Sequence, residues 1–142
     1  MSEKEFKPTI AFDFDGVVAE YEGFVGRDYV GKPNEKVVQT IRELKRFGCI
    51  IILHSTRGNE LLRDYCTKND IPFDYINENP ELEGANTGKP IATAYVDDRG
   101  INYHGQTADE LLDEIKKFRV YWKDAKNSKL HEYWEQNGNN GV

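Results

Sequence analysis

Apolar residues gather along the chain in four short segments, which are separated by stretches with helical spacing. The segments cover 9–14, 49–53, 73–76 and 94–96. The second is a continuous run rich in β-branched residues, which is typical of a strand that is covered on both faces. All four segments are therefore expected to form strands.

Helical patterns lie between and after these strands. They cover 34–48, 59–66, 107–122 and 129–136. Asn34 is placed to cap the first helix, and Gly48 is placed to end it. Asn59 is expected to cap the second, while Thr107 to Glu110 has the sequence of a capping box at the start of the third. The chain thus alternates strands with helices.

This alternation predicts βαβ units and a parallel sheet. With right-handed crossovers, such units form an α/β fold with a three-layer, doubly wound (Rossmann-like) parallel sheet. No internal repeat and no linker divides the chain, so a single domain is expected over 1–136. The segment 137–142 has no core residue before the final valine and is expected to form a disordered tail.

Composition narrows the class of protein. The chain has 142 residues, of which 38% are hydrophobic and 31% are charged, as in soluble single domains. It has no apolar run of membrane-spanning length and no N-terminal secretory pattern, so no membrane partner is expected and the cytoplasm is the expected location. The two cysteines form no CxxC motif and are expected to be buried thiols.

The net charge of −6 limits the kinds of ligand. An acidic chain repels phosphate backbones, so nucleic-acid binding is disfavoured. The same charge also repels a small phosphate ester. A protein of this composition that handles phosphate therefore needs a metal ion or a few well-placed basic side chains.

Polar residues collect where the expected strands end, which is where ligands bind in open parallel sheets. They follow the first, second and fourth strands or come just before the fourth: Asp13, Asp15, Ser55, Thr56, Arg57, Lys89, Asp97 and Asp98. These residues are remote in sequence, yet the expected fold brings them to one edge of the sheet. That edge is the candidate functional site.

Asp13 and Asp15 are two residues apart, so on a strand they project from the same face. Gly16 then lets the chain turn sharply. Two close carboxylates repel each other and favour a bound cation, and Mg²⁺ prefers oxygen ligands and leaves room for a substrate phosphate. Taken alone, this DxDG pattern is equally typical of a polar strand end or a turn.

The other polar residues also suit phosphate chemistry. A hydroxyl after the second strand can donate a hydrogen bond to a phosphate oxygen, and Arg57 or Lys89 can neutralise the phosphate charge. Asp97 and Asp98 can complete a Mg²⁺ site, and they close an apolar segment, where uncompensated charge is costly. Each of these residues alone is more typical of a helix cap, a turn or a solvated side chain.

Taken in order, FDFDG, Ser55, Lys89 and YVDD resemble the four motifs of the haloacid dehalogenase (HAD) superfamily. The match runs from about Ile10 to Gly100, with each motif at its expected element. The stretches FDYINENP and YVDDRGINYHG are also similar to a small bacterial and phage-type branch of HAD hydrolases. Four motifs in the right order make this resemblance specific.

The resemblance implies a Mg²⁺-dependent phosphatase, that is, a phosphoric monoester hydrolase that works through an aspartyl phosphate. Asp13 would be the nucleophile, and Asp15 would be the general acid and base. Ser55 and Lys89 would hold the transferring phosphoryl group. A second acid two residues after the nucleophile is similar to the phosphatase members of the superfamily.

The resemblance also implies a metal site and a substrate site. The implied Mg²⁺ ligands belong to the first and fourth motifs: the Asp13 carboxylate, the Asp15 backbone carbonyl, Asp97, and Asp98 directly or through water. Gly16, Thr56 and Arg57 are the expected substrate-binding residues. Ser55 is favoured as the hydroxyl that binds phosphate, with the adjacent Thr56 as the alternative.

No cap domain is expected, because neither gap between the motifs is long enough to hold one. The gaps cover 17–32 and 57–89. The site should be open unless a flap from Glu20 to Gly31, or a second copy of the chain in a homo-oligomer, covers it. A phosphorylated substrate is expected, with modest turnover of many small organophosphates, because an open site surrounds little of a small ligand.

Three other functions remain open. A non-catalytic phosphate- or Mg²⁺-binding module would keep the same fold. A receiver-like signalling module also combines acids, Mg²⁺, a hydroxyl and a lysine, although its phosphoacceptor normally follows a middle strand. A structural or interaction protein would use the aromatic-rich segment FRVYWKDAKNSKLHEYW, but such aromatic residues more often pack on their own domain.

Overall fold

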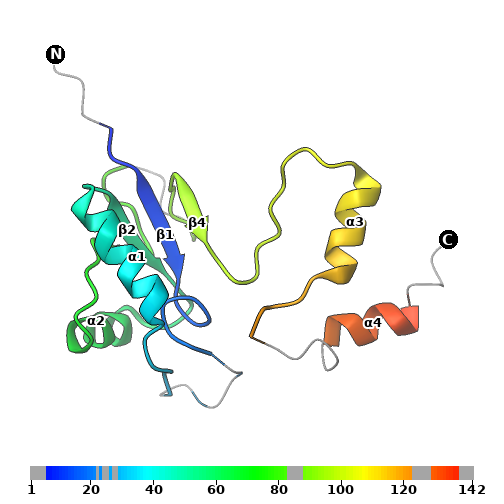
Figure 1. Cartoon of the computed structure of the whole chain (residues 1–142), viewed down its shortest axis with the longest axis horizontal. Coiled ribbons are helices and arrows are strands. Elements are labelled where there is room, and N and C mark those ends of the chain that lie inside the picture. The colour runs from blue at the N-terminus through cyan, green and yellow to red at the C-terminus, as the bar shows by residue number, and fades with distance from the viewer. Residues whose placement is uncertain are drawn as a thin grey trace. The chain divides into compact units, whose positions relative to one another are not determined.

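The computed structural model describes residues 6–21, 23, 26, 29–82, 88–122 and 129–137. The chain divides into two units, Met1–Asp97 and Asp98–Val142. All strands belong to the first unit, and the last two helices belong to the second (Figure 1). None of the helices within the described ranges is long and apolar enough to cross a membrane.

A parallel sheet organises the first unit. Its elements along the chain are β1 (Thr9–Asp13), α1 (Glu35–Arg46), β2 (Ile50–His54), α2 (Asn59–Lys68), β3 (Tyr75–Ile76) and β4 (Ala94–Val96). The strands lie in the order β3-β2-β1-β4, and every pairing is parallel. The expected α/β, Rossmann-like fold is therefore confirmed, and the described residues hold no cap domain.

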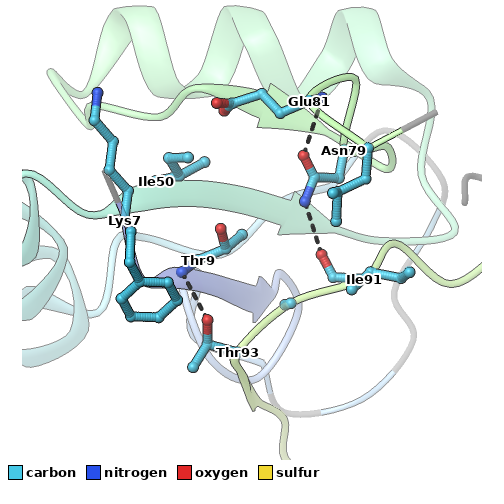
Figure 2. Close-up of a pocket in the computed structure, with 10 residues that line it drawn as sticks. Lys7, Thr9, Ile50, Asn79, Glu81, Ile91 and Thr93 are labelled. Atoms are coloured by element: carbon cyan, nitrogen blue, oxygen red, sulfur yellow. Dashed lines mark hydrogen bonds between the residues drawn. The ribbon is translucent and has the colours of Figure 1, made fainter. Parts of the chain in front are cut away.

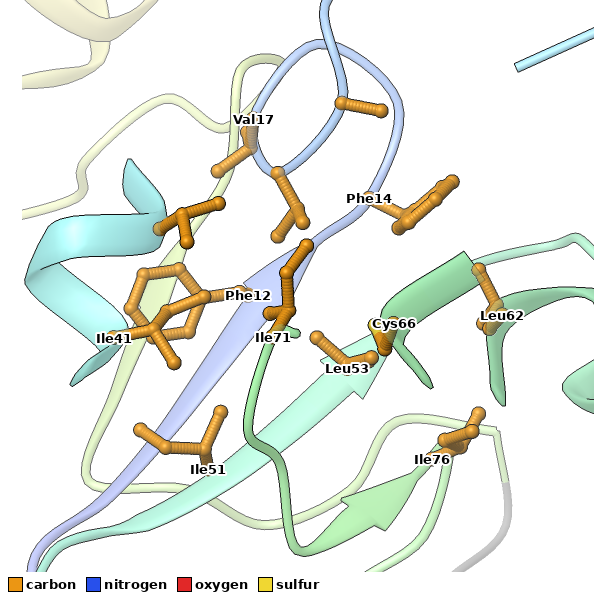
Figure 3. Close-up of a cluster of buried hydrophobic side chains, with 13 residues drawn as sticks. Phe12, Phe14, Val17, Ile41, Ile51, Leu53, Leu62, Cys66, Ile71 and Ile76 are labelled. Carbon is orange, nitrogen blue, oxygen red and sulfur yellow. The ribbon is translucent and has the colours of Figure 1, made fainter. Parts of the chain in front are cut away.

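Helices α1 and α2 pack against one face of the sheet (Figure 3). Residues alternate between the two faces of a strand, so Phe12 and Leu53, which are paired in register, point to this face together. They form one buried cluster with Ile41 of α1 and Leu62 of α2. All four side chains are at most 2% exposed, and burying each stabilises the fold by about 1.5–3 kcal/mol. This core holds the strand ends in place.

The expected capping residues lie at or next to the ends of α1 and α2, although the cap of α2 is one residue earlier than expected. Asn34 occupies the N-cap position of α1, as expected, and Gly48 follows the helix with a left-handed φ of 85°. Gly58 is the N-cap of α2, so the expectation that Asn59 caps this helix was wrong by one residue. The Asn59 side chain instead accepts a hydrogen bond from Asn77 Nδ2 at 3.0 Å, which draws it away from the helix end.

Part of the other face of the sheet lies under the connection between β3 and β4, while the residues of β4 are exposed (Figure 2). Asn79 in this connection is 2% exposed, and its Nδ2 donates to the Ile91 carbonyl at 2.9 Å. Thr93 N donates to the Thr9 carbonyl at 2.7 Å, and Thr93 Oγ1 accepts from Thr9 N at 3.1 Å. The described residues of the connection form no helix, and these bonds hold them to the sheet.

The second unit contains α3 (Ala108–Lys117) and α4 (Lys129–Asn137). The capping box is confirmed, because Thr107 Oγ1 accepts from Glu110 N and Glu110 Oε1 accepts from Thr107 N, both at 3.2 Å. The expectation that this helix continues to Trp122 was wrong, since the backbone becomes extended at Phe118 with a ψ of 135°. The expected tail, 137–142, starts with the last residue of α4, and 138–142 lie outside the described residues.

Candidate active site

Three aspartates meet where the strand order reverses. The chain runs from β1 outwards through β2 and β3 and then returns to place β4 on the other side of β1. Asp13 ends β1, and Asp97 follows β4 directly. The carboxylate oxygens of Asp13, Asp97 and Asp98 lie within 4.8 Å of one another. The aspartates therefore gather at a switch point of the sheet, where open α/β folds bind ligands.

This acidic group suits a divalent cation. Three carboxylates at such distances repel one another unless a cation or a proton lies between them. Asp98 Oδ1 is buried and has no hydrogen-bond partner among the described residues. Asp98 Oδ2 accepts a hydrogen bond from Trp122 Nε1 at 2.6 Å, so one oxygen is held while the other needs a ligand. An oxygen-only donor set of this kind fits Mg²⁺.

The turn after β1 carries Asp15, two residues beyond Asp13. Gly16 has a φ of 87°, a left-handed conformation that glycine adopts at the least cost. Gly16 N donates to the Ala19 carbonyl at 2.8 Å, and Ala19 N donates to the Phe14 carbonyl at 3.0 Å. Gly16 is itself buried, and its contribution here is to shape the turn that presents Asp15.

Arg57 reaches Asp15 from the loop that follows β2. Its Nε donates to Asp15 Oδ2 at 2.7 Å, and its Nη2 donates to Asp15 Oδ1 at 3.0 Å. The two side chains are 15% and 24% exposed. The hydrogen bond to Asp15 raises the pKa of the Arg57 guanidinium, which therefore stays charged. The structure thus pairs a predicted substrate-binding residue with the predicted acid and base.

The same loop holds Ser55 in a defined orientation. Ser55 Oγ accepts a hydrogen bond from Arg57 N at 3.1 Å, and Ser55 N donates to Asn77 Oδ1 at 2.8 Å. A hydroxyl that accepts one bond still carries a hydrogen to donate. The neighbouring Thr56 is exposed.

Lys89 lies on the loop that leads into β4. Its Nζ stands 4.4 Å from the centroid of the Tyr95 ring. Tyr95 pairs in register with Ala11, so it shares a sheet face with Ala11 and with Asp13, two residues further along β1. Within the described part of the chain Lys89 makes no ion pair with the aspartates, and it contacts an aromatic ring on their face of the sheet.

Three residues near the site were not singled out as site residues by sequence reasoning. Asn77 follows β3 with a left-handed φ of 57° and braces Ser55, and the only sequence signal for it is the stretch FDYINENP. Trp122 was expected on a helix, which hid its contact with Asp98. His54 ends β2 in register with Asp13, and its Nδ1 is buried without a partner in the described ranges. Each contact depends on a loop conformation or register that composition does not reveal.

The flap expected from Glu20 to Gly31 lies partly outside the described residues, but the residues at its base are paired. Glu20 N donates to the Lys32 carbonyl at 2.8 Å, and Asn34 N donates to the Val18 carbonyl at 2.8 Å. A Cβ added at Gly31 would lie 1.9 Å from the Glu20 carbonyl oxygen, so only glycine fits there. We call these paired residues, 18–20 and 31–34, the neck. Tyr65 of α2 fastens the neck, because its hydroxyl donates to the Gly31 carbonyl at 2.7 Å.

A separate hollow of about 630 Å³ lies at the opposite end of the strands, between the sheet and the β3–β4 connection (Figure 2). Its lining comes from the first residues of two strands, from that connection and from the segment before β1: Phe6, Lys7, Thr9, Ile50, Asn79, Glu81, Leu82, Ile91, Ala92 and Thr93. None of the predicted site residues lines it. The chemistry therefore belongs to the other end of the sheet.

Comparison with known proteins supports the fold. No family model matches the chain, and no curated protein matches it. Among solved structures, the chain is similar to a conserved protein from Bacteroides thetaiotaomicron, with 28% identity and a TM-score of 0.55 over 78% of this chain and 89% of that one. It also aligns with a structural-genomics target from Vibrio cholerae at 17% identity and a TM-score of 0.44, over 75% of this chain and 94% of that one. Neither description names an activity.

Proposed function

We propose that this protein is a Mg²⁺-dependent phosphatase of the HAD type, which hydrolyses phosphomonoesters through an aspartyl phosphate on Asp13. The observation that carries this proposal is the group formed by Asp13, Asp97 and Asp98, with carboxylate oxygens within 4.8 Å of one another. Asp98 contributes a buried oxygen that has no partner among the described residues. When bound there, Mg²⁺ would neutralise the charge that develops during phosphoryl transfer.

The proposed reaction has two displacement steps. An oxygen of Asp13 attacks phosphorus as the bond to the leaving oxygen breaks, and Asp15 gives that oxygen a proton. Asp15 then takes a proton from a water molecule, which attacks the phosphorus of the aspartyl phosphate. The bond from Asp13 to phosphorus breaks, inorganic phosphate leaves, and both carboxylates return to their starting states.

Ser55 is the better candidate for the hydroxyl that binds the phosphoryl group. Its oxygen already accepts from Arg57 N at 3.1 Å, and its hydroxyl hydrogen stays available to donate. Its backbone is braced by Asn77 at 2.8 Å. A donor that is oriented before the substrate arrives needs little rearrangement in the transition state. Thr56 is exposed and has no comparable brace among the hydrogen bonds of the described residues.

Lys89 supplies the positive charge that an acidic protein needs in order to accept phosphate. Its ammonium group stands over Tyr95, on the sheet face that carries Asp13. A lysine stem has four rotatable carbons, so the ammonium group can move from the ring to a phosphate oxygen. We propose that Tyr95 holds Lys89 near the site until the substrate binds.

The substrates that we propose are small phosphomonoesters of several kinds. The described residues include no cap domain that would enclose a small ligand, and tight specificity normally requires a concave pocket around most of the ligand. The site is therefore proposed to bind the phosphate group well and the rest of the substrate weakly. A panel of phosphorylated metabolites should show modest kcat/KM values of similar size.

The test is turnover of p-nitrophenyl phosphate with Mg²⁺ and with excess EDTA. Wild-type protein should be active only with the metal, and Asp13→Asn should remove turnover while keeping the circular dichroism spectrum, because an amide is a poor nucleophile. Asp109→Asn, an exposed substitution in the first turn of α3, is the matched control and should keep full activity.

Two outcomes would favour the alternatives. Binding of Mg²⁺ and phosphate without turnover would indicate a non-catalytic module. Stable phosphorylation by acetyl phosphate, again without turnover, would indicate a receiver-like role. If Asp13→Asn kept most of its kcat, Asp13 would not be the nucleophile and the proposed mechanism would be wrong.

A further inference from the structure

Arg57 has its guanidinium engaged by groups of the protein itself. Its Nε and Nη2 donate to the two oxygens of Asp15 at 2.7 and 3.0 Å. Its Nη2 also donates to the Tyr29 carbonyl at 2.8 Å. A planar guanidinium that grips both oxygens of a carboxylate fixes the plane of that carboxylate, which a single hydrogen bond does not do.

The base of the Arg57 side chain is held as firmly as its tip. Arg57 N donates to Ser55 Oγ at 3.1 Å, and Asn77 braces Ser55 in turn. The Arg57 and Asp15 side chains are 15% and 24% exposed, so solvent screens this pair less than a surface ion pair. The guanidinium therefore stands on a braced loop, with Asp15 and the Tyr29 carbonyl among its partners.

We propose that Arg57 is a positioning residue, which holds the Asp15 carboxylate for its acid and base work and links it to the Tyr29 backbone, and that it does not bind the substrate phosphate. This inference rests on the proposed function. It replaces the role expected for Arg57 from the sequence, namely binding of the substrate.

The charges around Arg57 favour a positioning role for this residue over a phosphate-binding role. If Arg57 turned to a phosphate, it would leave the Asp15 carboxylate without its bidentate partner beside a doubly charged ligand. The charges of the phosphate and of the Asp15 carboxylate would then repel each other strongly in a partly buried site. Lys89 and a bound cation can neutralise the phosphate without removing the partner of Asp15.

The contact with Tyr29 extends the effect to the flap. The returning arm of the flap is held at two points by the segment that follows β2. Arg57 donates to the Tyr29 carbonyl, and Tyr65 donates to the Gly31 carbonyl. Loss of Arg57 removes one of these two points together with the orientation of Asp15. One side chain thus links the proposed acid and base to the segment that borders the site.

The test compares Arg57→Gln and Arg57→Lys with wild type in kinetics and in binding. A positioning role predicts that kcat/KM falls about 10²-fold or more with an alkyl phosphate and less with p-nitrophenyl phosphate, whose leaving group needs no proton. The Kd for inorganic phosphate, measured by calorimetry, should stay within about twofold. Arg57→Lys should recover little activity, because an ammonium group cannot make the bidentate contact.

Two further measurements separate positioning from general damage. In an Asp15→Asn background, Arg57→Gln should cause little additional loss, because residues that act as one unit are not additive. The Nε–H resonance of Arg57 in ¹⁵N spectra should shift when Asp15 is replaced by Asn, whatever the activity. Arg46→Gln, which breaks an exposed pair with Glu43, is the matched control and should change none of these readouts.

The outcomes distinguish this inference from the proposed function. If wild type turns over no phosphomonoester with Mg²⁺, the proposed function fails and the role of Arg57 fails with it. If wild type is active but Arg57→Gln raises the Kd for phosphate tenfold and affects both substrates equally, only the positioning role is overturned. Full additivity with Asp15→Asn would overturn it as well. Thermal unfolding checks that each variant is folded, and Arg57→Lys serves if Arg57→Gln is not.

Discussion

Trp122 Nε1 donates a hydrogen bond to Asp98 Oδ2 at 2.6 Å, and the other oxygen of the same carboxylate is buried without a partner in the described part of the chain. The Arg99 guanidinium lies 5.5 Å from the centroid of the Trp122 ring. Groups that orient a metal ligand contribute to metal affinity without touching the metal. The aromatic-rich segment near the C-terminus therefore has a specific contact with the candidate metal site.

Trp122→Phe should weaken Mg²⁺ binding about 10- to 100-fold, because the ring is kept while the N–H that orients Asp98 is lost. Calorimetric titration with Mg²⁺, or with Mn²⁺ as a stand-in, measures the effect directly. Trp134→Phe removes an indole that has no hydrogen-bond partner within the described ranges, and it should leave the affinity unchanged. Equal affinities for wild type and Trp122→Phe, together with a loss in Asp98→Ala, would contradict the role of Trp122.

Asp74 should matter more for stability than a surface acid does. Its Oδ2 accepts from Ile51 N at 2.7 Å, and Lys45 Nζ lies 2.8 Å from both of its oxygens. Asp74→Ala leaves the Ile51 N–H and the Lys45 ammonium group without these acceptors, so the free energy of unfolding should fall by about 2–3 kcal/mol. Urea denaturation measures this change as a lower midpoint at a constant slope.

The control for Asp74 is the exposed pair of Arg46 and Glu43. Their side chains are 75% and 48% exposed, and such pairs contribute at most about 1 kcal/mol. Asp74→Asn keeps an acceptor for Ile51 N and should fall between the other two variants. If Asp74→Ala were no more harmful than Arg46→Gln, the bond to Ile51 N would have no part in stability.

The folded state should lose stability at alkaline pH because of the buried thiol of Cys66. Burial raises the pKa of Cys66 from 9.0 to about 11, and burial also raises the pKa of Tyr65 above its ordinary value. For a group with a higher pKa in the folded state, the stabilising contribution is complete below the unfolded pKa and is lost as the pH rises to the folded pKa. The Tm should therefore drop between about pH 9 and 11, and thermal scans at several pH values measure the slope.

Cys66→Ala should reduce the slope with which the Tm falls at alkaline pH, because the thiol that ionises more readily in the unfolded chain is gone. Its Tm at neutral pH should also be lower, since the substitution leaves a cavity in the core. Cys49→Ala is the matched control for the loss of a buried thiol from the core at neutral pH. Parallel slopes for Cys66→Ala and wild type would show that other groups cause the alkaline loss.

The sequence could predict that Asp13 and Asp97 meet, because parallel strands end at the same edge whatever the details of their loops. It could not predict that Arg57 holds Asp15, which is 42 residues away. That contact depends on the conformation of the loop after β2, and Arg57 is equally suited by charge to a phosphate. A resemblance to a family supplies the residues of a motif, but the partner of each side chain comes from the fold.

Trp122 shows the limit of periodicity. The apolar spacing from Leu111 onwards suits a helix, yet the backbone leaves the helical region at Phe118. The chain leaves the helix after Lys117 and turns at 121–122, where Trp122 contacts Asp98. The strands that hold Phe12 and Leu53 were predicted for the opposite reason, because each is a short apolar segment whose conformation does not depend on a neighbouring loop.

Gly31→Ala should lower both stability and activity. The added Cβ would lie 1.9 Å from the Glu20 carbonyl oxygen, so the two arms of the neck must separate. Gly31 is buried, and Val18 and Ala19 of the neck belong to the hydrophobic cluster, so the Tm should fall, and kcat/KM should fall about tenfold or more through misplacement of groups at the site. Lys32→Ala, with a side chain that is 78% exposed, is the control and should retain activity. A variant with normal kcat/KM would mean that the neck can open without disturbing the site.

The neck also makes the segment between Glu20 and Gly31 a suitable place to replace one loop sequence by another. The chain enters at Glu20 and leaves at Gly31 with these two residues in contact, so any replacement segment needs only to bridge two nearby points. The entropic cost of closing such a loop rises slowly with its length, by about 0.6 kcal/mol for each doubling. A library could therefore vary the number and type of residues between these two points in order to change which substrate the protein recognises. The proposed nucleophile, the proposed metal ligands and the sheet would keep their places.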